Sequence, residues 1–261
     1  MGVYAVTGSA SGIGAATAAR LRQDGHRVIE VDRDCGDVVA DLGVPAERSR
    51  AVDEIAAQVG DGLAGLVCCA GIAGTSDRHG ADLVSVNYFG AVRLLEGLRP
   101  LLAASGTAAA VTVSSNSVTC QPGWPTDIAD ACLADDEAAA RELASTAEAV
   151  QVYPATKAAL AWWTRQQAVT EDWAGAGIRL NAVTPGLVAT PMTDGVRSDP
   201  VLGGLIDAFP VPVDRPGRPE EVAGVIAFLL SPDAALCCGS VLFTDGGTDA
   251  LFNPRRPEPA G

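Results

Sequence analysis

The stretch that organises this chain reads Val3-Tyr4-Ala5-Val6-Thr7-Gly8-Ser9-Ala10-Ser11-Gly12-Ile13-Gly14, an apolar run that meets a glycine-rich turn. The run has the length of a β-strand, and apolar residues with helical spacing follow as far as Gly25. Glycine lets a backbone approach a pyrophosphate closely, and the amino end of a helix offers it free N–H groups. The stretch therefore predicts a strand, a phosphate-binding turn and a helix, and the alternative is an ordinary tight loop.

A second strand-like run, Val28-Ile29-Glu30-Val31, ends at Asp32. A carboxylate at this place can accept hydrogen bonds from the adenosine ribose of NAD, and it would repel the additional phosphate of NADP. Arg33 follows directly, and an arginine can accommodate that phosphate. We therefore expect NAD as the cofactor, and Arg33 leaves NADP open.

Lys157 is the only lysine among the 18 basic residues, and it lies four positions after Tyr153. On a helix these two side chains share one face. An ammonium beside a phenol stabilises the phenolate and lowers the pKa of the tyrosine, which suits a general acid or base. The alternative interpretation is a chance pair on a helix surface.

Strand and helix patterns alternate along the chain, which predicts parallel strands with helices on both faces of a sheet. We expect an α/β, doubly wound parallel sheet of about seven strands in one domain, residues 1–252. Residues 253–261 contain three prolines, and we expect this tail to be frayed. The expected strands span residues 3–7, 28–31, 38–40, 63–69, 108–113, 178–183 and 240–244. The expected helices span 15–25, 47–59, 83–102 with Pro100 ending or kinking it, 153–173 and 219–230.

The glycine spacing T-G-x-x-x-G-x-G and the Tyr153/Lys157 pair resemble the short-chain dehydrogenase/reductase family, and the resemblance runs from about Val3 to Gly247. Further motifs that carry it are Asn87 in 86–90, Val113-Ser114-Ser115, residues 179–186 and Thr244-Asp245-Gly246-Gly247. Cys69-Ala70-Gly71, residues 85–90 and a long insert before Tyr153 resemble the bacterial 3α-hydroxysteroid dehydrogenase/carbonyl reductase subgroup. The resemblance implies a Rossmann-type fold.

The resemblance also implies a role for each residue that matches a family motif. Tyr153 exchanges a proton with the substrate oxygen, Ser115 hydrogen-bonds that oxygen, and Lys157 holds the nicotinamide ribose and lowers the pKa of the tyrosine. Asn87 organises a water that connects Lys157 to solvent, or, alternatively, bonds a backbone group inside its helix. The implied cofactor-binding residues are Thr7, Gly8, Ser9, Ser11, Gly12, Ile13, Gly14, Asp32, Asp41, Leu42, Ala70, Gly71, Tyr153, Lys157, Pro185, Gly186, Val188 and Thr190.

Two stretches interrupt the alternation. Residues 120–149 resemble an insertion, and the segment 127–150 carries a net charge of −6 with Ile128, Leu133, Leu143 and Val150 at helical spacing. We expect one or two short helices with an acidic outer face, either as a surface elaboration or as a wall of the substrate cleft. Residues 187–217 are rich in proline and glycine and follow a strand end, where ligands bind in open α/β sheets. In the family that the chain resembles this region is a substrate lid, and the alternative is a merely irregular connection.

Composition excludes several classes of protein. The formal net charge of −14 argues against nucleic-acid binding, and no apolar run has the length of a membrane span. No signal peptide is evident, the seven cysteines lack disulfide or zinc spacing, and neither histidine lies in a metal-ligand cluster, so we expect a cytoplasmic protein without a metal.

We also expect a homodimer or homotetramer. Copies of the acidic segment would repel one another across a two-fold axis, so we expect association through the helix 220–230 and the strand 240–244.

Together these observations predict an NAD(H)-dependent oxidoreductase that interconverts a secondary alcohol and a ketone on a bulky apolar substrate. The subgroup resemblance points to a 3α-hydroxysteroid. A tailoring reductase of a polyketide or terpenoid pathway and a catalytically silent NAD-binding regulator are the alternatives. The sequence does not select the substrate, the stereochemistry or the direction of the reaction.

Overall fold

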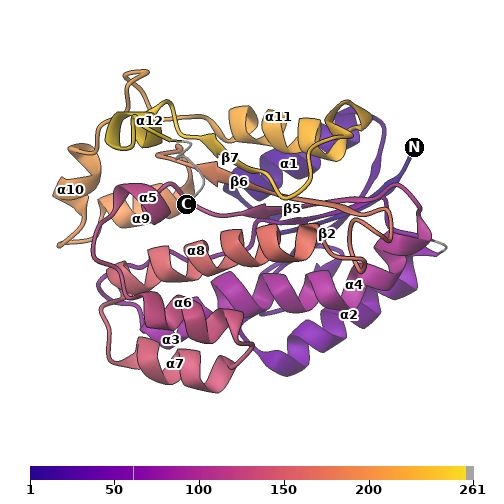
Figure 1. Ribbon diagram of the computed structural model, residues 1–261, viewed down its shortest axis with the longest axis horizontal. Helices are drawn as coiled ribbons and strands as arrows, with labels where there is room; N and C mark the ends of the chain where they lie inside the picture. The colour runs from indigo at the N-terminus through magenta and orange to yellow at the C-terminus, as the bar shows by residue number, and fades with distance from the viewer. Residues whose placement is uncertain (61, 257–261) are drawn as a thin grey trace.

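A parallel β-sheet in the order β3-β2-β1-β4-β5-β6-β7 forms the centre of the computed structural model, which describes residues 1–60 and 62–256 (Figure 1). Within these residues the sheet has seven strands, as the sequence predicts. Strand order reverses between β1 and β4, and such a reversal opens a crevice at the carboxyl ends of the strands. The strands are β1 (Val3–Thr7), β2 (Arg27–Asp32), β3 (Val38–Val39), β4 (Gly65–Cys68), β5 (Ala109–Val113), β6 (Arg179–Pro185) and β7 (Val241–Thr244).

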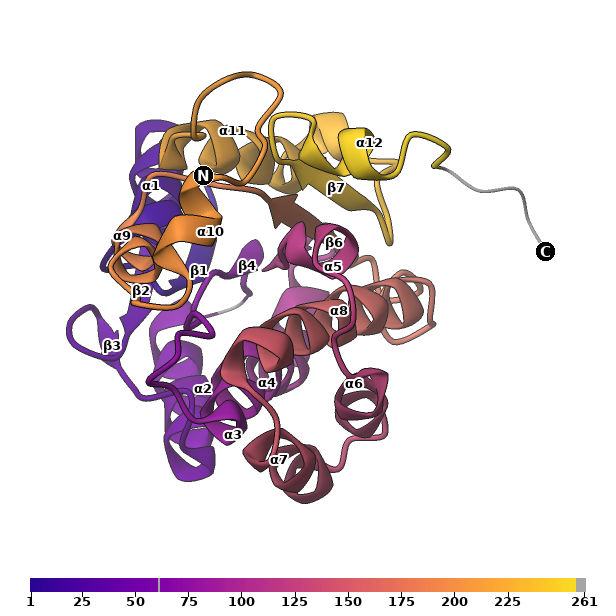
Figure 2. The ribbon, with the colours of Figure 1, turned by 90° about the vertical axis from the view of Figure 1, so that its left-hand side faces the viewer.

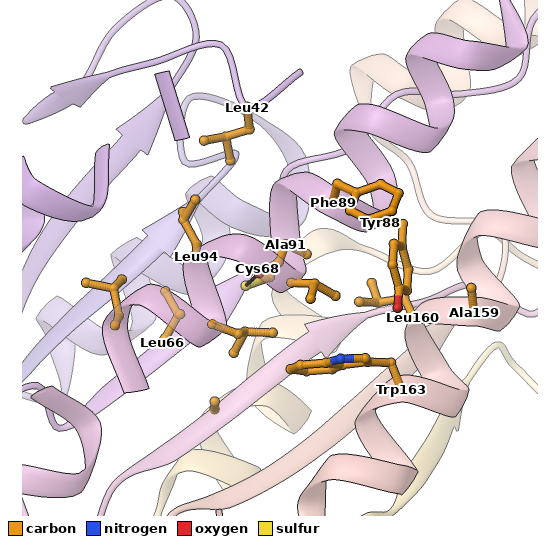
Figure 3. Packing of buried hydrophobic residues seen from close by; sticks show 14 of the residues in the cluster. Leu42, Leu66, Cys68, Tyr88, Phe89, Ala91, Leu94, Ala159, Leu160 and Trp163 are labelled. Carbon is orange, nitrogen blue, oxygen red and sulfur yellow. Dashed lines mark hydrogen bonds between the residues drawn. The ribbon is translucent and has the colours of Figure 1, made fainter. Parts of the chain in front are cut away.

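Helices cover both faces of the sheet (Figure 1). One face carries α1 (Gly12–Gln23) and α11 (Pro219–Leu230), and the other carries α2 (Pro45–Val59), α4 (Gly90–Ala104) and α8 (Ala149–Ala168). Side chains alternate along a strand, so neighbours in β4 serve different cores: Leu66 packs beneath α4, whereas Val67 packs beneath α11. Figure 3 shows the larger core, where Tyr88, Phe89, Leu160 and Trp163 meet. Both faces of the central strands are therefore buried, which explains their continuous apolar sequence.

The helix expected over residues 83–102 differs in detail from the prediction. It begins as α3 (Gly80–Leu83), passes through a π-helical segment, η1 (Val84–Phe89), and continues as α4. Pro100 lies inside α4 and does not end it, because Leu98 and Leu102 on either side are fully buried in the core. Tertiary packing here outweighs the local preference of proline.

Other boundaries shift by a few residues. α2 begins with a proline in its first turn, Pro45, where the missing N–H needs no partner, rather than at residue 47. α8 ends at Ala168 instead of 173, and Trp173 is buried in the turns that follow.

The segment 120–149 forms two short helices, α6 (Thr126–Leu133) and α7 (Glu137–Ser145), after the single turn α5 (Ser117–Cys120). α6 packs against α8 on the side away from the sheet, and α7 lies beyond it (Figures 1 and 2). The buried side chains are mostly small, among them Ala129, Cys132 and Ala140. Leu143, in contrast, is 38 % exposed.

The segment 187–217 contains α9 (Pro191–Arg197) and α10 (Gly203–Asp207) beside the carboxyl ends of the strands (Figure 2). The chain then forms α11, η2 (Pro232–Ala234), β7 and α12 (Thr248–Phe252). At the start of the tail, the Asn253 side chain donates to the Thr119 carbonyl at 3.3 Å, which anchors this residue. The expectation of a frayed end at residues 257–261 lies outside the described residues. Among the described helices, none combines the length and the apolar character that a membrane span requires.

Candidate active site

A cavity of about 910 Å³ lies at the carboxyl ends of the strands and brings together residues from most of the sheet. Of the residues singled out in the sequence, it is lined by Gly8, Ser11, Gly12, Ile13, Gly14, Asp32, Asp41, Leu42, Ala70, Gly71, Ser115, Tyr153, Lys157, Pro185, Gly186, Val188 and Thr190. Residues from positions 8 to 190 thus share one cavity, because every parallel strand ends at the same edge.

The glycine-rich turn is compact because its backbone packs against itself and against β4. Gly8 has φ +66°, and a Cβ on it would lie 2.8 Å from the Ala70 backbone. A Cβ on Gly14 would lie 2.0 Å from the Gly8 carbonyl oxygen. The turn opens α1, whose N-cap, Ser11, makes no side-chain cap and whose first turn has no acidic residue. The amino end of this helix can therefore receive an anion from the cavity.

Thr7 and Ser9 occupy different positions from those expected of phosphate-binding side chains. Both are buried and outside the cavity lining. The Thr7 hydroxyl accepts from the Ala70 N–H at 3.0 Å, and the Ser9 hydroxyl donates to the Val31 carbonyl at 3.3 Å. Each hydroxyl therefore bonds a backbone group beneath the turn and links two segments there.

Asp32 lies at the end of β2 beside the turn. One carboxylate oxygen accepts from the Ala10 N–H at 3.0 Å, which orients the side chain along the rim of the cavity. Arg33 is exposed and pairs with Asp34 at 3.4 Å. The positive charge of Arg33 is therefore partly neutralised by Asp34.

Tyr153 and Lys157 lie one turn apart on α8 and both line the cavity, as their spacing predicts. The Lys157 Nζ lies 5.9 Å from the centre of the Tyr153 ring and donates to the Val113 carbonyl at 2.9 Å. The Ser115 hydroxyl follows the end of β5 and accepts from the Ser117 N–H at 3.2 Å. The hydroxyl of the adjacent Ser114 is buried and donates to the Lys157 carbonyl.

Burial governs the ionisation of this pair. It raises the pKa of Tyr153, and interaction with Ser115 offsets only part of that rise. Burial also lowers the pKa of Lys157 to about 8. The net effect is a raised pKa of Tyr153 rather than the lowered one that the sequence predicts, because desolvation of the phenol is the largest influence on it.

Asn87 lies in the π-helical segment η1 and is fully buried beneath the cavity. Its side-chain amide forms two hydrogen bonds with the backbone of Ile72, accepting from the N–H at 2.8 Å and donating to the carbonyl at 3.0 Å. The Asn87 amide therefore bonds a backbone group, and this partner lies in the loop after β4 rather than in its own helix. Gly71 permits this approach, since a Cβ there would lie 3.1 Å from Asn87 Oδ1 and 3.3 Å from Lys157 Nζ.

The outer part of the cavity is lined largely by apolar side chains of the segment 187–217. They include Met192, Val201 and Leu205, of which the last two are more than 60 % exposed. From the segment 120–149, the lining comes from its two ends, at Gln121 and Glu148, and not from α6 or α7. The insert therefore borders the cleft only at its ends.

Asp199 was not singled out in the sequence, yet it joins the segment 187–217 to the loop after β4. One oxygen accepts from the Ser76 N–H at 2.7 Å and the Ser76 hydroxyl at 2.8 Å, and the other accepts from the amides of Val201 and Leu202. These bonds lower the pKa of Asp199 to about 2. The sequence signal for the local half of this arrangement is Asp199-Pro200, a frequent turn start, but nothing in it indicates Ser76.

Within the described residues, no group of three or more histidine, cysteine or acidic side chains is placed to hold a metal ion. The cavity instead combines a glycine-rich anion cradle, an acid at the end of β2, and a serine, tyrosine and lysine on one wall. This arrangement serves hydride transfer with a nicotinamide cofactor.

Comparison with known proteins agrees with this geometry. Residues 2–126 match the family described as short chain dehydrogenase, and residues 139–249 match the family described as enoyl-(acyl carrier protein) reductase. The chain belongs to the short-chain dehydrogenase family, and it is an oxidoreductase that uses a nicotinamide cofactor.

Particular relatives resemble the chain over nearly its whole length. It is 37 % identical to 3-alpha-hydroxysteroid dehydrogenase/carbonyl reductase of Comamonas testosteroni, with 97 % of this chain and 99 % of that one covered. It is 33 % identical to cis-4-hydroxycyclohexanecarboxylate dehydrogenase of Sinomonas cyclohexanicum, over 95 % and 97 % of the two chains. The crystal structure of the 3-alpha-hydroxysteroid dehydrogenase from Pseudomonas sp. B-0831, complexed with NADH, superposes with a TM-score of 0.92 at 44 % identity, over 97 % and 99 % of the two chains. The family and the subgroup resemblance predicted from the sequence are confirmed.

Proposed function

We propose that this oxidoreductase prefers NAD(H) and interconverts a secondary alcohol and a ketone on a bulky alicyclic substrate, with 3α-hydroxysteroids as the leading class. The observation that carries the proposal is the position of Ser115, Tyr153 and Lys157 on one wall of a cavity whose outer part is apolar. The relatives described as hydroxysteroid and hydroxycyclohexanecarboxylate dehydrogenases support a ring-bearing substrate.

The cradle at the start of α1 fits a dinucleotide. Any side chain at Gly8 or Gly14 would collide with backbone atoms, and a Cβ on Gly12 would lie 3.2 Å from the Thr190 side chain. Glycine at these positions therefore allows the tight turn that a pyrophosphate can approach closely. We assign the pyrophosphate to residues 11–14 and Thr190, and the adenosine ribose to Asp32. Asp41 and Leu42 would border the adenine.

The other end of the cofactor would lie near α8. We assign the nicotinamide and its ribose to Ala70, Gly71, Lys157, Pro185, Gly186 and Val188, all of which line the cavity. When bound, the nicotinamide supplies the hydride acceptor or donor. Thr7, Ser9 and Asn87 act from beneath by fixing backbone segments.

Tyr153 moves the proton in this proposal. It accepts the proton of an alcohol or returns one to a ketone, and Ser115 donates a hydrogen bond to the same substrate oxygen. Lys157, protonated below a pKa of about 8, favours the phenolate when the substrate oxygen needs its proton removed. Because burial raises the pKa of Tyr153, we expect alcohol oxidation to become faster as the pH rises above neutral.

Turnover assays test the proposal. The protein would be incubated with NAD or NADP and with a panel of hydroxysteroids, substituted cyclohexanols, polyketide and terpenoid alcohols and short linear alcohols, and formation of reduced nicotinamide would be followed. We expect a hydroxysteroid or another ring alcohol to give the highest kcat/KM, with NAD preferred. Turnover confined to polyketide or terpenoid substrates would replace the steroid, and NADH binding without turnover of any substrate would leave a silent NAD-binding protein.

We further propose a cytoplasmic homodimer or homotetramer that associates through α11 and β7. α6 covers the outer side of α8, which is the face that would otherwise be available to a second copy, whereas Phe228 and Leu242 remain exposed on α11 and on the edge strand β7. The seven cysteines all lie in the described residues as free thiols, in keeping with a reducing compartment. Phe228→Glu should reduce the oligomer size in light scattering, and an unchanged oligomer would argue against this interface.

A further inference from the structure

Arg48 is a buried arginine on α2, with 3 % of its side chain exposed. Its Nε donates to the Leu42 carbonyl at 2.6 Å. One terminal nitrogen, Nη2, donates to the carbonyls of Gly43 at 3.2 Å and Ser85 at 3.1 Å. The guanidinium thus joins two segments that are distant in sequence, the loop after β3 and the segment η1.

Both segments form one end of the cavity. Leu42 follows Asp41, and these two residues line the cavity together with Val86, which follows Ser85. The two segments also touch directly, since a Cβ on Gly43 would lie 3.1 Å from the Val86 side chain. The position of Arg48 therefore sets the position of this wall.

Glu137, on the insert helix α7, holds Arg48 from the other side. Its two oxygens accept from Nη1 at 2.7 Å and from Nη2 at 2.8 Å, and the Ser85 hydroxyl donates to it at 2.9 Å. Burial tends to raise the pKa of Glu137, but the bonds from Arg48 and Ser85 more than offset this, so the pKa is lowered and the residue is ionised at neutral pH. A buried guanidinium needs such a counter-charge, because removing one partner of a buried pair leaves the other charge uncompensated.

We propose that Glu137 is a positioning residue for the adenine end of the cofactor site and acts through Arg48. The proposal rests on the assignment of Asp41 and Leu42 to the adenine under the proposed function. It gives part of the acidic insert a role in cofactor binding, even though α7 itself does not line the cavity.

Glu137→Gln tests the proposal, because it keeps the size of the side chain and removes its charge. The matched control is Glu142→Gln, which removes the same charge from the same helix at an exposed position whose side chain has no hydrogen bond or ion pair within the described residues. Dissociation constants for NADH and for adenosine monophosphate would be measured on the whole chain, at a temperature well below the unfolding midpoint. Steady-state kinetics would accompany them.

We expect Glu137→Gln to weaken both ligands by about tenfold, the scale of one hydrogen bond to a charged group. The KM for NAD should rise in parallel while kcat remains within about twofold, since a defect confined to the adenine end affects binding and not the hydride step. Glu142→Gln should behave as the wild type. Arg48→Lys, which keeps the charge but lacks the planar fork, should weaken adenosine monophosphate at least as much as Glu137→Gln does.

Several outcomes would overturn the proposal. A lowered unfolding midpoint with wild-type affinity for adenosine monophosphate would make the ion pair purely structural, and a fall in kcat with unchanged KM would place its effect elsewhere. If Glu137→Gln does not fold, Glu137→Asp, which keeps the charge on a shorter side chain, must show an intermediate loss of affinity. Failure of the wild type to bind NADH or adenosine monophosphate would instead contradict the proposed function itself.

Discussion

Replacing Lys157 by methionine removes a charged group that the fold buries. The lysine is 4 % exposed, and its pKa falls from 10.5 to about 8 because the ammonium is desolvated. The unfolded chain holds this proton up to a pH near 10.5, whereas the folded protein releases it near 8. Between these values the unfolded state binds more protons, so a rise in pH stabilises the wild type through Lys157.

The size of the effect follows from the shift. Each pKa unit corresponds to about 1.4 kcal/mol, so the contribution of Lys157 to the free energy of unfolding should increase by about 2 to 3 kcal/mol between pH 7 and pH 10. The methionine variant lacks this increase. It also loses the hydrogen bond to the Val113 carbonyl, which lowers its stability at both pH values.

Urea denaturation of both proteins at pH 7 and pH 10, without cofactor, measures the difference. From pH 7 to pH 10, we expect the free energy of unfolding of the wild type to increase by this amount relative to that of Lys157→Met. We also expect the variant to have no turnover at either pH. Arg165→Met is the control, because it makes the same kind of replacement at an exposed position of the same helix. An equal difference in the free energy of unfolding between the wild type and Lys157→Met at both pH values would contradict the lowered pKa of Lys157.

Three further predictions concern the cofactor and the lid. Tyr153→Phe should reduce kcat by about 10² to 10⁴ while the dissociation constant for NADH stays near that of the wild type, and retention of most of the activity would remove Tyr153 from proton transfer. Asp32→Ala, with Arg33 left in place, should shift the ratio of kcat/KM for the two cofactors toward NADP; equal KM values for both cofactors in the wild type would contradict a dominant role for Asp32. Asp199→Asn should raise the rate of NADH dissociation in stopped-flow measurements, because the bonds that join the segment 187–217 to Ser76 lose a charge-assisted acceptor; an unchanged rate would show that this contact does not retain the cofactor.

Local patterns were sufficient for much of the fold and for the centre of the site. The alternation of strands and helices, the glycine spacing and the acid at Asp32 each depend on neighbours within a few residues or one βαβ unit. The same holds for Tyr153 and Lys157, which a single helical turn brings onto one face. Ser115 and Pro185 were assigned to the site by the family resemblance, and both follow strands whose carboxyl ends meet at one edge of the sheet.

Other features depended on what surrounds each group in three dimensions. Whether the pKa of Tyr153 rises or falls is decided by burial against charge, and burial is a property of the packed molecule. Asn87 could serve a water or a backbone group, and only the approach of Ile72 settled its partners.

The sequence by itself indicated the parallel α/β architecture, the cofactor cradle and the Tyr153/Lys157 pair, because these follow from backbone periodicity and short spacings. The assignment of Ser115 came from the resemblance to the short-chain dehydrogenase/reductase family. Tertiary structure alone decided the partners of Arg48 and Asp199. Arg48 meets Glu137 across 89 positions, and Asp199 meets Ser76 across 123. In sequence each of these charges looks like an ordinary surface residue, because a charged side chain can pair with any opposite charge or polar group that the fold brings near it. Only the packing of α7 on the segment η1, and of the segment 187–217 on the loop after β4, selects one partner among many.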